Sequence, residues 1–144
     1  MDSLIVASKL EALRRCIKRI EERRTNSADA LRASADLQDI VSVNITRAVQ
    51  LCVDIAAHVL ADTEQPAPQT MGEAFDGLVV SGVITAELCK RMRGAVGFRN
   101  IAVHSYQAID WDIVHAITHD GLEDFRQFAA AVAKRLGKKG GSGP

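Results

Sequence analysis

Apolar residues recur along this chain at intervals of three and four, which is the spacing of one face of an α-helix. The first such stripe follows Ser3, a residue type suited to cap a helix. This stripe consists of Val6, Leu10, Leu13, Ile17 and Ile20. The polar run at residues 21–26 ends this helix, and a short helix is predicted for residues 27–33.

The longest helix is predicted for residues 35–61, where Ser34 provides the cap. Two apolar stripes run along it, so we expect it to pack on both sides and to form the centre of a bundle. One stripe consists of Leu37, Val41, Asn44, Ala48, Leu51, Ile55 and His58. The other consists of Ile45, Val49, Cys52, Ala56 and Val59.

The only clear loop, residues 62–69, contains two prolines and separates the two halves of the chain. After it, Thr70 and Glu73 have the spacing of a capping box and open a helix over residues 71–81. Gly82 is expected to stop this helix.

The last part of the chain is predicted to form three more helices. Thr85 caps a helix over residues 86–106, and Asp110 starts a shorter one. Gly121 is expected to break the chain before a final helix over residues 122–136.

The predicted fold is all-α, an antiparallel bundle of about five main helices. A chain of 144 residues suits one domain, placed at residues 1–136, with a flexible Gly/Lys-rich tail at residues 137–144. The 47% hydrophobic and 25% charged residues are typical of globular domains and exclude disordered, collagen-like and coiled-coil chains.

Charge and cysteine content narrow the possible binding partners and cellular location of the protein. The formal net charge is zero, so any contact with nucleic acid must use a local basic patch. No apolar run approaches the roughly 20 residues of a membrane span, and the first residues lack the features of a signal peptide, so no membrane contact is expected. Three cysteines without paired spacing indicate reduced thiols in a cytoplasmic protein.

Side chains suited to phosphate chemistry gather near the end of the helix predicted for residues 86–106. Arg99 and Tyr106 lie seven residues apart and are expected to share a face, whereas Asn100 and His104 lie four apart and stack. Arg93 precedes His104 by eleven residues and is nearly aligned with it. Spacing alone favours ordinary structural roles for these residues.

Two glycines, Gly94 and Gly97, interrupt the same helix. A glycine inside a helix costs about 1 kcal/mol relative to alanine. The pair therefore indicates that another element, such as a second helix backbone, approaches closely.

The order Arg99, Asn100, His104, Tyr106 resembles the R-x4-H-x-Y signature of HEPN-domain toxins of the HepT family. The similarity extends over about residues 4–132. It includes the LQD run at 37–39, the EAF run at 73–75 and the GV-x3-EL run at 82–88.

The resemblance implies the toxin half of a toxin–antitoxin pair, a metal-independent ribonuclease with Arg99 and His104 as catalytic residues and Asn100, Tyr106 and Arg93 in support. RNA cleavage without a metal needs a base, an acid and positive charge at the phosphorane, which imidazole and guanidinium groups supply. Because one chain has one histidine in the signature, we expect a homodimer to bring two copies together. No cofactor and no metal is expected.

The resemblance also implies a partner, a cognate minimal nucleotidyltransferase antitoxin that attaches AMP to Tyr106. Asp39 and Asn44 are candidates to orient Arg99 or His104. The alternative is a non-catalytic helical binding module or a regulatory subunit for a nucleotidyltransferase. Transfer RNA and messenger RNA both stay open as substrates.

Two further histidines, His115 and His119, have a spacing that metal ligands can use. No HExxH pattern or nearby cysteine pair accompanies them, so a pair of surface histidines is predicted.

Overall fold

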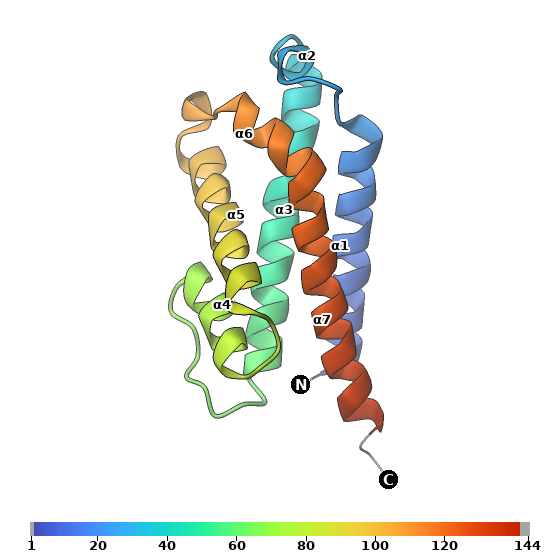
Figure 1. Ribbon diagram of the computed structural model, residues 1–144, viewed down its shortest axis with the longest axis vertical. Helices are drawn as coiled ribbons and strands as arrows, with labels where there is room; N and C mark the ends of the chain where they lie inside the picture. The colour runs from blue at the N-terminus through green and yellow to red at the C-terminus, as the bar shows by residue number, and fades with distance from the viewer. Residues whose placement is uncertain (1, 142–144) are drawn as a thin grey trace.

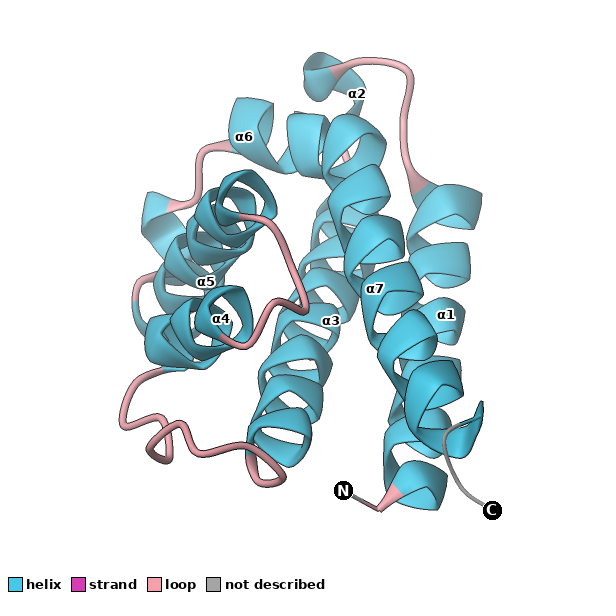
Figure 2. Cartoon of the chain, turned by 60° about the horizontal axis from the view of Figure 1, so that its bottom comes forward, coloured by secondary structure: helices cyan, strands magenta, loops and turns pink. Residues whose placement is uncertain are grey.

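The computed structural model describes residues 2–141 and shows a bundle of helices, with no strand within that range. The four long helices lie side by side in antiparallel order (Figure 1): α1 (Ser3–Arg23), α3 (Ala35–Leu60), α5 (Ala86–His104) and α7 (Leu122–Gly141). The shorter helices are α2 (Ala28–Arg32), α4 (Met71–Val80) and α6 (Trp111–Ala116). Helices α2 and α6 lie at the end of the bundle away from both chain termini (Figures 1 and 2). The predicted all-α antiparallel bundle is confirmed.

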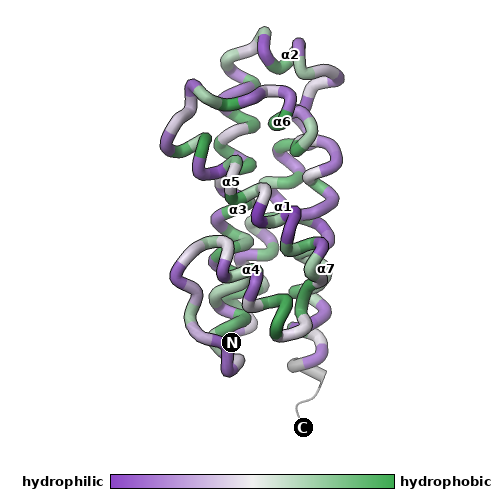
Figure 3. The backbone as a smooth tube through the Cα atoms, turned by 60° about the vertical axis from the view of Figure 1, so that its left-hand side comes forward, coloured by the Kyte–Doolittle hydropathy of each residue, from purple (hydrophilic) through white to green (hydrophobic). Residues whose placement is uncertain are grey.

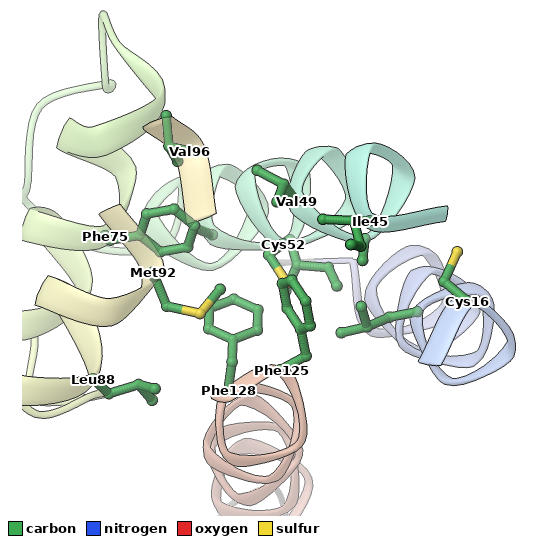
Figure 4. Close-up of a cluster of buried hydrophobic side chains, with 14 of the residues drawn as sticks. Cys16, Ile45, Val49, Cys52, Phe75, Leu88, Met92, Val96, Phe125 and Phe128 are labelled. Atoms are coloured by element: carbon green, nitrogen blue, oxygen red, sulfur yellow. The ribbon is translucent and has the colours of Figure 1, made fainter. Parts of the chain in front are cut away.

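Helix α3 is the centre of the bundle, as its two apolar stripes predict. It packs against α1, α4, α5 and α7, and eleven of its residues are buried. Its side chains meet aromatic rings from α4 and α7, and the Phe75 and Phe128 rings pack edge to face with centroids 5.8 Å apart (Figure 4). Green and purple segments alternate along the helices when the backbone is coloured by hydropathy (Figure 3), as expected for amphipathic helices around one core.

Helix α3 is also long and apolar enough to cross a membrane, with a mean hydropathy of 1.4 in its most apolar window. This differs from the sequence-based expectation that no such run exists. Half of that window is buried inside the protein, and the core helix of a helical bundle meets the same criteria.

The helix caps follow the predictions with one correction. Asp2 rather than Ser3 caps α1, because its carboxylate accepts the backbone N–H groups of Leu4 and Ile5 at 3.0 and 3.2 Å. Gly82 ends α4 with φ of +75°, a left-handed conformation that favours glycine. The Val83 N–H bonds the Leu78 carbonyl there at 2.9 Å, which completes a Schellman motif.

The helix predicted for residues 86–106 ends two residues early, at His104. Ser105 adopts φ −148° and ψ 56°, which is not helical, and Tyr106 begins a short 3₁₀ turn, Tyr106–Ala108. Tyr106 therefore does not share a helical face with Arg99, contrary to the prediction.

The predicted break at Gly121 is wrong. A π-helical turn, Ile117–Gly121, joins α6 to α7 without a loop. A Cβ added at Gly121 would lie 3.2 Å from Ile117 Cγ2, so glycine fits this wide turn.

Helix α7 continues to Gly141 rather than ending at residue 136, because no proline interrupts it before residue 144. Residues 137–141 of the predicted tail are thus helical, and residues 142–144 lie outside the described part of the chain.

Candidate active site

Helix α5 carries the signature residues and is held by its buried face. The Thr85 hydroxyl caps its start by accepting the Leu88 N–H at 3.1 Å. Five α5 residues pack into the core: Leu88, Cys89, Met92, Val96 and Phe98. Because this anchoring fixes the rotation of the helix, an opposite stripe faces solvent, and it consists of Lys90, Arg93, Gly94, Gly97, Asn100, Ile101 and His104.

Arg99 is half-buried on α5. Its Nη1 donates to the Asn100 side-chain oxygen at 3.3 Å. Its Nε is buried and has no hydrogen-bond partner among the residues that the structure describes. An unsatisfied guanidinium N–H is costly in this setting.

His104 is the last residue of α5 and is exposed. Arg99 and His104 lie five positions apart, about 140° around the helix. The two catalytic candidates of one chain therefore point in different directions.

Tyr106 lies beside the first turns of α3. Its hydroxyl donates to Asp39 Oδ1 at 2.8 Å, and its ring packs edge-on against Trp111 with centroids 6.1 Å apart. Asp39 was a candidate to orient Arg99 or His104, and its observed partner is Tyr106 instead. Burial of the phenol, together with the hydrogen bond and charge of Asp39, raises the pKa of Tyr106 above its ordinary value.

Arg93 does not join this group. Its Nη1 forms an ion pair with Asp76 Oδ2 at 2.6 Å, and its guanidinium packs on Gly72, where an added Cβ would lie 2.7 Å from Nη1. Eleven residues of helix separate it from His104, or roughly 16 Å along the axis. The observed contacts of Arg93 connect α4 to α5, so its alignment with His104 does not bring the two side chains together.

Asn44 is buried on α3, and its amide donates to the Ile40 carbonyl of the same helix at 2.8 Å. That bond uses Asn44 to satisfy its own helix rather than to orient Arg99 or His104. Asn44 also lines a groove of about 860 Å³ between α1 and α3, together with Asp39, Arg15, Arg19 and Arg47.

Gly94 and Gly97 lie against no other element among residues 2–141. A Cβ added at either position would have no heavy atom within 4 Å. The close approach that the sequence indicates is therefore absent within one protomer, because both glycines lie on the solvent-facing stripe of α5.

His115 and His119 are half-buried rather than on the surface. Their ring centroids lie 4.6 Å apart, and His119 Nε2 lies 3.0 Å from the Thr25 carbonyl. Within residues 2–141, no group of three His, Cys, Asp or Glu side chains is arranged to hold a metal ion. The three cysteines are free and buried.

Sequence reasoning missed two features of this region. Asp39 and Tyr106 are 67 residues apart in the sequence, and no local sequence pattern predicts a contact over that distance. The clustering of Arg15, Arg19 and Arg47 depends on how α1 packs against α3.

An all-helical bundle whose site helix carries Arg99 and ends at His104, with Tyr106 just beyond, defines a HEPN-domain protein, and comparison with solved structures agrees. The chain matches a tri-AMPylated Shewanella oneidensis HEPN toxin in complex with MNT antitoxin with a TM-score of 0.85 and 34% identity, over 93% of this chain and 99% of that one. YutE from Bacillus subtilis, a cytosolic protein of unknown function, shares the fold at 12% identity with a TM-score of 0.83, over 100% of this chain and 95% of that one.

The family model for HepT-like ribonucleases matches residues 13–132, so the chain belongs to the HepT-like ribonuclease family. It is 36% identical over 124 residues to an mRNA nuclease HepT of Shewanella oneidensis. This match covers 86% of this chain and 92% of the relative. It is 28% identical over 136 residues to a tRNA nuclease HepT of Aphanizomenon flos-aquae, over 94% of this chain and 92% of that relative. The chain is thus a ribonuclease rather than a non-catalytic helical module.

Proposed function

We propose that this chain is the toxin of a toxin–antitoxin pair and that it cleaves RNA at a site formed by Arg99 and His104 of two protomers. One observation carries the proposal. Arg99 keeps a buried, unpartnered Nε, and the exposed His104 lies on the same helix about 140° away. A single chain therefore presents both groups without assembling them around one phosphate.

The exposed stripe of α5 supports a twofold contact between protomers. Gly94 and Gly97 present no side chain, so a second helix backbone can approach them closely. Ile101 continues the stripe with 44% of its surface exposed, and burying it would be favourable. Parallel packing of two α5 helices along this stripe, about a twofold axis that runs along the pair, would bring both copies of His104 to the same end and into one cleft.

The chemistry of such a cleft follows from its residues. One imidazole removes the proton from the ribose 2′-hydroxyl, and the other protonates the departing 5′-oxygen. The guanidinium of Arg99 neutralises the charge that develops on the phosphorane. The products would be a 2′,3′-cyclic phosphate and a 5′-hydroxyl end.

The groove between α1 and α3 offers the local basic patch that a chain of zero net charge needs for RNA. Arg19 and Arg47 line it and have no ion-pair partner among residues 2–141. Their guanidinium groups suit phosphate oxygens. The groove reaches Asp39, the partner of Tyr106, and so extends to the signature region.

The antitoxin in this proposal is a minimal nucleotidyltransferase that attaches AMP to Tyr106. The phenol is 40% exposed, and a toxin similar to this one over 99% of its length is described as tri-AMPylated and in complex with an MNT antitoxin. An AMP group at Tyr106 adds an anion and a nucleoside next to the cleft, and both would exclude RNA.

Purified protein tests the catalytic site. Wild-type chain should release 2′,3′-cyclic phosphate ends in the presence of EDTA, and Arg99→Ala and His104→Ala should each lower cleavage at least about 100-fold, because each removes a group that acts on the phosphate. His58→Ala, the same change at a half-buried position of α3, serves as the control and should cleave at the wild-type rate. Cleavage that survives in the His104→Ala variant, or that requires a divalent metal, would overturn the mechanism.

Expression in cells would identify the class of RNA that this chain cleaves. The relatives are named for messenger and transfer RNA respectively, and mapping RNA ends after expression of this chain would show which is cut. Growth arrest that the neighbouring nucleotidyltransferase gene relieves would confirm the pairing with an antitoxin.

A further inference from the structure

The Tyr106 hydroxyl is held by a carboxylate that RNA cleavage does not use. Its proton points to Asp39 Oδ1 at 2.8 Å, and the Trp111 ring packs against its edge. With its proton directed at Asp39, the phenol oxygen keeps its lone pairs free for attack. Because 40% of Tyr106 is exposed, an electrophile can approach from solvent.

We infer that Asp39 is the general base for the transfer of AMP to Tyr106, so that the toxin itself supplies the base for its own modification. The inference rests on the proposed function and adds a residue to it. A carboxylate already within hydrogen-bond distance of the attacking oxygen meets the geometric requirement for a general base.

The step balances with a nucleoside triphosphate held by the antitoxin. The Tyr106 oxygen attacks the α-phosphorus and forms a new P–O bond, and the bond from that phosphorus to the pyrophosphate oxygen breaks. The phenol proton passes to Asp39, and pyrophosphate leaves with the electron pair of the broken bond. A base is needed because burial and the Asp39 charge raise the pKa of Tyr106, so the phenol is protonated at neutral pH.

Ser42 lies one turn beyond Asp39 on α3 and adds to this arrangement. Only 3% of the residue is exposed, and its hydroxyl makes no hydrogen bond with the residues that the structure describes. It nevertheless lies close enough to the phenol to lower the pKa of Tyr106, in opposition to the larger effect of burial. A free hydroxyl at that position can donate to the tyrosine oxygen as negative charge develops on it.

The product cannot keep the original contact. The ester oxygen carries no proton, so the hydrogen bond to Asp39 is lost, and the attached phosphate places a negative charge close to the carboxylate. Repulsion between these charges would move the modified side chain away from α3. Modification would thus turn the nucleotide out of the Asp39 contact and toward the exposed side of α5.

The test measures the initial rate of the first AMP addition by intact-mass spectrometry, with purified toxin, its nucleotidyltransferase partner and ATP–Mg²⁺. Asp39→Asn keeps a hydrogen-bond acceptor and removes the base. It should lower kcat by about 100- to 10,000-fold and leave the KM for ATP unchanged, because ATP is bound by the partner. The rate of the variant should rise with pH as the phenol ionises, whereas the wild-type rate is flat across neutral pH.

Asp36→Asn is the matched control, because it makes the same change three residues earlier on α3 and should modify at the wild-type rate. A rate for Asp39→Asn within about twofold of wild type would overturn the inference, as would a deficit that higher pH does not relieve. Failure of the proposed function gives a different result: wild-type chain that gains no AMP, or a Tyr106→Phe variant that still gains it.

Discussion

Tyr106 shows how one long-range contact sets the ionisation of a side chain. Its ring packs against Trp111 and its hydroxyl is bound to Asp39, so the phenol is partly shielded from water and faces a negative charge. Both effects disfavour the phenolate. It is the single tyrosine of the chain, which makes it directly observable.

Ultraviolet titration of the phenolate should therefore place the pKa of Tyr106 above the ordinary value of 10.0. Asp39→Asn should move the midpoint downward, because the charge of Asp39 is one of the causes of the shift. The folded-state pKa is raised, so the interaction stabilises the fold at pH below 10 and the stabilisation is lost as pH rises through the folded-state pKa. A midpoint below 10 in the wild-type protein would contradict the observed contact.

At the scale of elements, one face of α5 packs into the core and the opposite face is exposed to solvent. The buried face fixes the helix against α3, α4 and α7, whereas the opposite stripe carries two glycines whose missing side chains leave open space. Glycine lowers helix stability, so two glycines within a single turn of an exposed stripe need a reason outside the single chain.

The variant Gly97→Ala tests whether a second α5 helix packs on this stripe or whether the stripe stays exposed to solvent. In an isolated chain the new methyl group meets nothing, and the variant should gain up to about 1 kcal/mol in free energy of unfolding from helix propensity. If a second α5 packs on this stripe, the methyl group should weaken the dimer and lower RNA cleavage. We expect the second result, measured by sedimentation and by RNA cleavage at low micromolar concentration. A variant that is more stable, equally dimeric and fully active would place the interface elsewhere.

At the scale of the whole molecule, the bundle places the chemistry at the end away from both termini (Figure 1). There α5 ends, α3 begins, and α2 and α6 close the bundle.

The described chain alone separates Arg99 from His104, so activity is expected to depend on assembly. Light scattering should give twice the chain mass of 15.6 kDa.

Mixing experiments test whether both histidines of one dimer are needed. Wild-type chain and His104→Ala chain are unfolded together in equal amounts and refolded. With random pairing, about one quarter of the dimers then contain two wild-type chains. Cleavage should fall to that fraction, because one imidazole acts as base and the other as acid. Cleavage at about one half of the wild-type level would show that each histidine acts independently.

Sequence reasoning works well wherever structure depends on neighbours along the chain. The helices, their caps at Ser34, Thr70 and Thr85, and the left-handed Gly82 follow from local hydrogen bonds and from the period of apolar residues. Its errors have local causes too. A carboxylate one residue before Ser3 was the better cap, and a wide π turn let the chain pass Gly121 as a helix.

The sequence alone determined the bundle, the central position of α3 and the R-x4-H-x-Y signature, because periodicity and a short motif are properties of neighbouring residues. Only the tertiary structure decided the partners of the signature. It paired Tyr106 with Asp39 and Arg93 with Asp76, and among the residues it describes it gave Arg99 Nε no hydrogen-bond partner. Such contacts depend on how helices far apart in the chain rotate and pack, and that rotation is set by the shape of the whole core.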